Sequence, residues 1–101
     1  MIPTTTAILG FTEKSITDAI IKNRQAYVQC NLTITDLHTA RKSLSKALAQ
    51  PIIRKNLKLR NEVKSVIASV DSVISQTACE KGVHSSEISE LTHILNTLQV
   101  A

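Results

Sequence analysis

The chain has 101 residues, of which 43% are apolar, 20% are charged and only 2% are aromatic. This length argues for one domain, and the apolar fraction is too high for a disordered protein. The scarcity of aromatic side chains disfavours a base-stacking surface, and no stretch approaches the roughly 20 apolar residues needed to cross a bilayer.

The N-terminus lacks the basic start and apolar core of a signal peptide. Two cysteines, Cys30 and Cys79, are too few for a disulfide framework. We therefore expect a cytoplasmic protein with reduced cysteines.

Glycine and proline are rare and leave long uninterrupted blocks. The glycines are Gly10 and Gly82, and the prolines are Pro3 and Pro51. A β protein needs a turn about every 8–12 residues, so blocks of this length favour an all-α fold.

The block from 11 to 50 carries apolar residues at alternating spacings of four and three, typical of a helix that packs lengthwise against a partner. Thr12 is a candidate N-cap, so we expect one helix over about 12–49. A break near 31–35, where β-branched residues and possible caps occur, would instead give a compact four-helix bundle. The predicted seam of this helix consists of Ile16, Ile20, Tyr27, Cys30, Ile34, Leu37, Leu44 and Leu48.

Two polar residues, Asn23 and Arg41, occupy seam positions of this block. A polar residue at such a position can fix the register or oligomeric state of a coiled coil, or it can simply reach solvent. For Arg41 the second interpretation is favoured, and for Asn23 the two are balanced.

Pro51 suits the first position of a helix but not its interior, so it predicts a chain reversal near Gln50. We expect a second helix over about 51–80, closed by Gly82, and a short third helix over about 86–99. Residue i then faces roughly residue 101 − i across the hairpin. The predicted seam of the second helix consists of Ile52, Leu59, Val63, Val66, Val70 and Val73.

These elements predict an all-α fold, a long antiparallel helical hairpin plus a short C-terminal helix. We expect a single helical domain over 1–101, with 1–10 a flexible or extended segment. Such a hairpin leaves apolar surface uncovered, so we expect it to assemble into a multi-helix bundle as a homo-oligomer, most simply a dimer.

The net charge of +4 is unevenly distributed. Residues 41–64 carry eight bases against one acid, whereas the other 77 residues carry a net charge of −3. Because crowded like charges destabilise a fold, the cluster is a candidate docking patch for an anionic partner, or else a solvated surface. The bases of this cluster are Arg41, Lys42, Lys46, Arg54, Lys55, Lys58, Arg60 and Lys64.

No residue pattern indicates catalysis. Cys79, His84 and His93 lack the paired short spacings of a zinc site, and two isolated glycines cannot form a phosphate-binding loop. We therefore expect a non-enzymatic protein with no cofactor and no metal site.

Two functional hypotheses follow. The first is a protein–protein interaction module, an adaptor, chaperone or regulator that acts as a helical homo-oligomer. The alternative is a nucleic-acid-binding protein that uses residues 41–64. Such binding would be indifferent to sequence, because base readout would need a recognition helix or stacking aromatic residues.

Overall fold

The computed structural model describes residues 5–100, with side chains from Thr12 onward, and every regular element in that range is a helix. The expected all-α fold is therefore confirmed. The elements are α1 (Thr5–Ala49), α2 (Pro51–Arg54) and α3 (Leu57–Val100).

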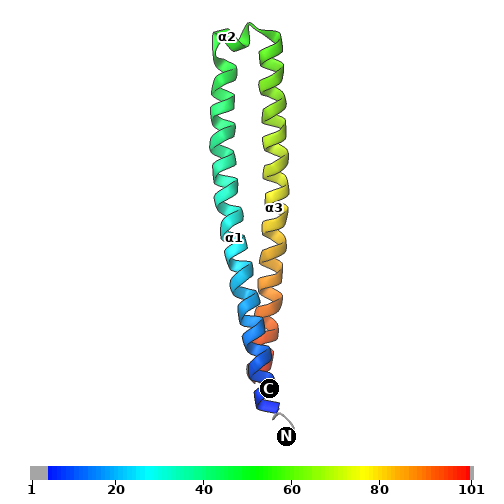
Figure 1. Cartoon of the computed structure of the whole chain (residues 1–101). Coiled ribbons are helices and arrows are strands. Elements are labelled where there is room, and N and C mark those ends of the chain that lie inside the picture. The colour runs from blue at the N-terminus through cyan, green and yellow to red at the C-terminus, as the bar shows by residue number, and fades with distance from the viewer. Residues whose placement is uncertain (1–4, 101) are drawn as a thin grey trace. The chain divides into compact units, whose positions relative to one another are not determined.

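The chain divides into two compact units, and in each a segment of α1 lies beside an antiparallel segment of α3 (Figure 1). The terminal unit comprises Met1–Gln29 and Lys81–Ala101, and the turn unit comprises Cys30–Glu80. The turn unit contains α2 and is a helical hairpin, as expected. The expectation of a single domain stays a prediction.

Helix α1 is continuous across 31–35, so the alternative break at that point is wrong. The hydroxyl groups of Thr35 and Thr39 donate to the carbonyls of Asn31 and Thr35, at 3.0 and 3.1 Å. These threonines thus satisfy their hydroxyls within the helix.

The start of α1 differs from the prediction. The helix begins at Thr5, so residues 5–10 are helical rather than extended, and Thr12 lies inside the helix instead of capping it. Residues 5–11 contain no helix breaker other than Gly10, and one glycine destabilises a helix by only about 1 kcal/mol. The helix can therefore begin before the predicted position. The remainder of the expected extended segment, residues 1–4, lies outside the described residues.

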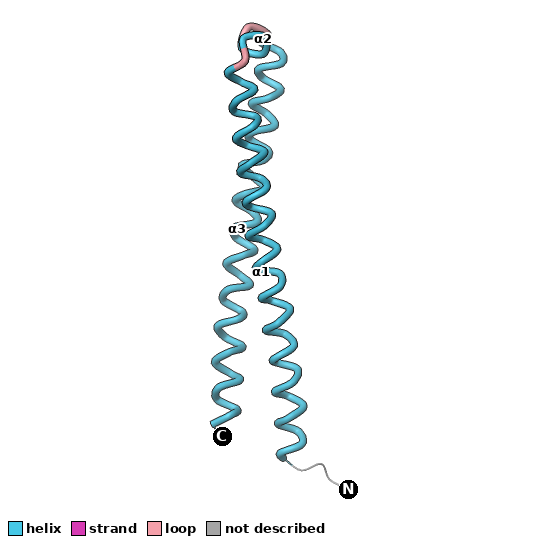
Figure 2. Tube along the Cα trace, turned by 90° about the vertical axis from the view of Figure 1, so that its left-hand side faces the viewer, coloured by secondary structure: helices cyan, strands magenta, loops and turns pink. Residues whose placement is uncertain are grey.

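The chain reverses over Gln50 to Asn56, a longer segment than the predicted turn at Gln50-Pro51 (Figure 2). Gln50 is extended, as the residue before a proline prefers, and Pro51 starts the single turn of α2. Asn56 then caps α3, because its Oδ1 accepts a hydrogen bond from the Leu59 amide at 3.2 Å. The second long helix therefore begins at Leu57 and not at 51.

This longer reversal shifts the register between the helices. Arg41 contacts Asp71, where the relation 101 − i predicted Arg60. In the terminal unit Asn23 meets His84, where the same relation gives a residue near 78. The predicted facing of Arg41 with Arg60 is thus wrong, because seven residues make the reversal instead of two.

The predicted helix end at Gly82 and the separate helix over 86–99 are also wrong, because α3 runs through to Val100. No described glycine has a positive φ, so Gly82 does not adopt the left-handed conformation that closes a helix. Apart from Asp71 and Thr92, the buried and half-buried positions of α3 recur at alternating spacings of three and four on both sides of Gly82. These positions are Arg60, Val63, Ile67, Val70, Ile74, Thr77, Lys81, His84, Ile88, Leu91, Leu95 and Leu98.

Gly82→Ala is expected to raise the free energy of unfolding by about 0.5–1 kcal/mol, because alanine lowers the entropy cost of helix formation. An added Cβ meets no heavy atom within 4 Å, so no steric cost offsets this gain. Ala78→Gly, at another exposed position of α3, should lower stability by about 1 kcal/mol. Urea unfolding followed by circular dichroism measures both. An unchanged or lower stability for Gly82→Ala would contradict an uninterrupted α3.

The core of the described chain is thin. Ile20 and Cys30 are the only buried apolar side chains among the described residues, with exposed fractions of 6% and 8%. Thr77 is equally buried, and its hydroxyl donates to the Val73 carbonyl at 2.8 Å. The other predicted seam residues of α1 are half-buried and lie on its packed face, namely Ile16, Tyr27, Ile34, Leu37, Leu44 and Leu48.

The seam predicted for the second helix is partly wrong. Val63 and Val70 lie on the packed face of α3, but the other four predicted residues are exposed. The packed face instead includes Ile67 and Ile74. Only the series of positions that contains these two residues continues at helical spacing through Thr77 and beyond Gly82. The exposed four are Ile52, Leu59, Val66 and Val73. That these four residues contact a partner helix, as the seam pattern predicts, stays a prediction.

Candidate functional site

The basic cluster lies wholly within the turn unit. Its first three members belong to the last turns of α1, Arg54 ends α2, Lys55 follows it, and the other three lie in the first turns of α3. The fold therefore brings together side chains from three helices around one reversal.

Most of these bases are exposed and unpaired. Arg60 is half-buried, and the other members are exposed. Among the described residues, Arg41 is the only member of the cluster in an ion pair, with its Nε 2.6 Å from Asp71 Oδ1. The remaining seven bases have no acidic partner among the described residues, and six of them are exposed, whereas the Nε of Arg60 is buried.

The Arg41–Asp71 pair also joins the two helices of the turn unit. The hydrogen bond to Asp71, and then its negative charge, raise the pKa of Arg41 above its usual value. Both side chains are nearly half-exposed, so solvent screens the pair and its main effect is on register. Arg41 thus has a cross-helix partner, which the favoured interpretation of a free, solvated side chain did not foresee.

Asn23, the second polar residue of the α1 seam, also has a partner on α3. The Nδ1–H of His84 donates to Asn23 Oδ1 at 2.9 Å, since a carboxamide oxygen only accepts. Asn23 Nδ2 in turn donates to the Ala19 carbonyl at 3.0 Å. One turn away, Lys81 Nζ lies 5.1 Å from the centre of the Tyr27 ring, within cation–π range.

Sequence reasoning missed these partners of Asn23 and Tyr27. Lys81 and His84 occupy consecutive positions of the α3 packed face. Continuing the spacing pattern of the second helix past Gly82 would therefore have predicted that both residues face α1. The prediction of a helix end at Gly82 broke that pattern just where the polar contacts lie.

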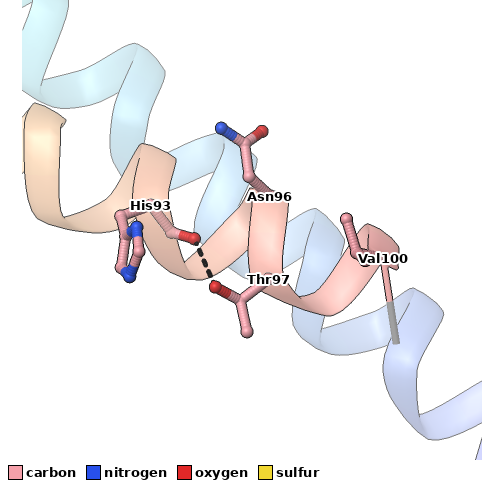
Figure 3. Close-up of a pocket in the computed structure, with 4 residues that line it drawn as sticks. All are labelled: His93, Asn96, Thr97 and Val100. Atoms are coloured by element: carbon pink, nitrogen blue, oxygen red, sulfur yellow. Dashed lines mark hydrogen bonds between the residues drawn. The ribbon is translucent and has the colours of Figure 1, made fainter.

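Two depressions open to solvent lie on the surface of the described residues. One is lined by four exposed residues of the end of α3, His93, Asn96, Thr97 and Val100 (Figure 3). The Thr97 hydroxyl donates to the His93 carbonyl of its own helix at 2.9 Å, so this hydrogen bond lies within α3. A second depression lies along one face of α1, lined by Thr35, His38, Thr39 and Lys42.

Neither depression combines an acid, a base and a nucleophile from different elements, as catalysis requires. In the described part of the chain, no three His, Cys, Asp or Glu side chains gather closely enough to hold a metal ion. Cys30 and Cys79 are free thiols, the first buried and the second exposed.

No helix within residues 5–100 has the length and apolar character needed to span a membrane. Comparisons of the chain with models of known protein families, with curated proteins and with solved structures give no match.

Proposed function

We propose that this chain is a small, non-enzymatic, cytoplasmic protein–protein interaction module, an adaptor, chaperone or regulator that acts as a helical homo-oligomer. Its basic cluster would dock the anionic surface of a protein partner. The observation that carries the proposal is the thin core, because only two described apolar side chains are buried. Helices with so little apolar burial of their own gain stability from further helices.

The basic cluster supports the docking part of the proposal. Seven of its eight bases have no acidic partner among the described residues, and they surround one reversal of the chain. Folding alone gives no reason to concentrate like charges in this way. An acidic helix or peptide would neutralise them and gain fast, electrostatically steered association.

Titration of a fluorescein-labelled acidic peptide, followed by anisotropy, tests this docking. The pair Lys55→Glu and Lys58→Glu should weaken binding at least tenfold, because two attractive charges become repulsive. The matched pair Lys14→Glu and Lys22→Glu changes the net charge equally in the terminal unit and should weaken it less than about threefold. Equal losses in both pairs would show attraction by net charge alone and would contradict a docking patch.

Sequence-indifferent binding of nucleic acid is the second candidate. It is favoured by the distribution of the bases over α1, α2 and α3, which would suit several phosphates rather than one small ligand. If 4–6 bases contact phosphates, affinity for duplex DNA should follow salt with a log–log slope of about −4 to −5. Duplex DNA and RNA at 50 and 200 mM salt therefore serve as further probes, with a roughly 200- to 1,000-fold loss of DNA affinity expected. Absence of binding at the lower salt would eliminate this candidate.

A further inference from the structure

The turn unit has an exposed apolar row beside the packed face of α3. Leu59, Val66 and Val73 are seven residues apart, so they align along one side of the helix. Their exposed fractions are 40%, 48% and 42%, although valine and leucine gain free energy on burial. The row therefore has apolar surface for a further helix to cover.

The neighbouring row on α1 is made of small residues. Thr33, Ala40 and Ala47 are also seven residues apart and flank the packed face of α1. Ala40 and Val66 are equally distant in sequence from the middle of the reversal, as are Ala47 and Leu59. Rows that flank the two packed faces on the same side lie next to each other in an antiparallel pair. The two rows together form what we call the flanking face of the turn unit.

The chain exposes more surface than a compact protein of its mass. The chain exposes 7520 Å², whereas a compact 11.0 kDa monomer exposes about 5,600 Å². If a second copy covered the difference on both chains, on the order of 3,800 Å² would be buried. Obligate homodimers bury roughly 2,000–5,000 Å².

The charges of the turn unit specify an orientation for that second copy. The end near the reversal carries the basic cluster. The opposite end, residues 30–40 and 65–80, carries no lysine or arginine, and its acids are Asp36 and Glu80 besides Asp71, which pairs with Arg41 of its own chain. Two turn units side by side in the same direction would bring their basic clusters together, whereas opposite directions pair each cluster with acids.

From these observations we infer that the flanking face is the dimer interface, covered by the flanking face of a second copy in antiparallel orientation. The inference rests on the proposed homo-oligomeric function and specifies its interface. A two-fold axis perpendicular to the helices then passes near Ala40 and Val66, and places α3 against α3 of the second copy. Val66 meets its own counterpart, and Leu59 meets Val73 of the other chain.

Cysteine cross-linking of the full chain tests this geometry, in a background carrying Cys30→Ala and Cys79→Ser. Val66→Cys should form a disulfide-linked dimer under mild oxidation. Ser65→Cys, which is adjacent in sequence but outside the flanking face, should not. An equimolar mixture of Leu59→Cys and Val73→Cys should cross-link, whereas Leu59→Cys alone should not, because two Leu59 positions are about 21 Å apart and a disulfide needs Cα atoms within about 7 Å.

Light scattering of the unmodified chain at 50 μM provides the independent measurement, with twice the monomer mass expected. A monomer would overturn the dimer, while the peptide titration still reports separately on docking by the basic cluster. A dimer in which Val66→Cys fails to cross-link would overturn this interface and leave the homo-oligomer standing. Cross-linking of Val66→Cys with Ala40→Cys, but not with itself, would indicate a parallel dimer and equally overturn the proposal.

Discussion

Ile20→Ala is expected to lower the free energy of unfolding by about 2–3 kcal/mol. Ile20 is the most buried apolar side chain among the described residues, and its truncation removes three buried carbon atoms and leaves a cavity. The expected loss is at the lower end of the range for such truncations, because no described side chain is fully enclosed and the neighbours can partly close the gap.

The next residue provides a matched control for Ile20→Ala. Ile21 has the same side chain and the same helix, but 47% of it is exposed, so Ile21→Ala should change stability by less than about 0.5 kcal/mol. Urea unfolding at one fixed protein concentration measures both variants, since the stability of an oligomer depends on concentration. Similar losses in the two variants would contradict the packing phase of α1.

The double substitution Asn23→Leu with His84→Leu is expected to stabilise the chain by about 2 kcal/mol. It replaces a hydrogen-bonded polar pair on the packed faces with two half-buried leucines, each gaining about 1 kcal/mol from apolar burial. Asn23→Leu alone should gain less, because it leaves the half-buried His84 Nδ1 without its partner.

The same double variant should lose structural uniqueness. A polar pair at seam positions disfavours alternative registers and oligomers, in which its members would be buried unpaired. We therefore expect a single mass in light scattering for the unmodified chain and several masses for the double variant. A double variant that is both more stable and of one mass would show that Asn23 and His84 do not set the register.

The packed face of α1 could be read from the sequence because it depends on local spacing. Ile16, Ile20, Cys30 and Ile34 follow the alternating pattern, and a helix places such residues on one side whatever it packs against. For α3 the pattern allowed two phases, since valine or leucine at 59, 66 and 73 and isoleucine at 67 and 74 both fit helical spacing. The choice between them depended on contacts with α1.

The candidate site also combines a feature that the sequence predicts with one that it does not. Which bases belong to the cluster follows from the sequence of residues 41–64 alone. Two helices that flank a reversal within this segment bring its basic side chains together. The pairing of Arg41 with Asp71 does not follow, because it depends on the number of residues in the reversal. Asn56 set that number by capping α3 with its side chain, an interaction that competes with continuation of the helix from Pro51.

The sequence by itself determined the helical fold, the position of the reversal near Pro51 and the concentration of positive charge around it, because scarce helix breakers, residue spacing and charge are local properties. Only the tertiary structure decided the register between the helices, which residues of α3 face α1, and whether the helix continues through Gly82. An exposed glycine in a helix costs about 1 kcal/mol, which contacts on both sides of it can outweigh, and those contacts join residues distant in the chain.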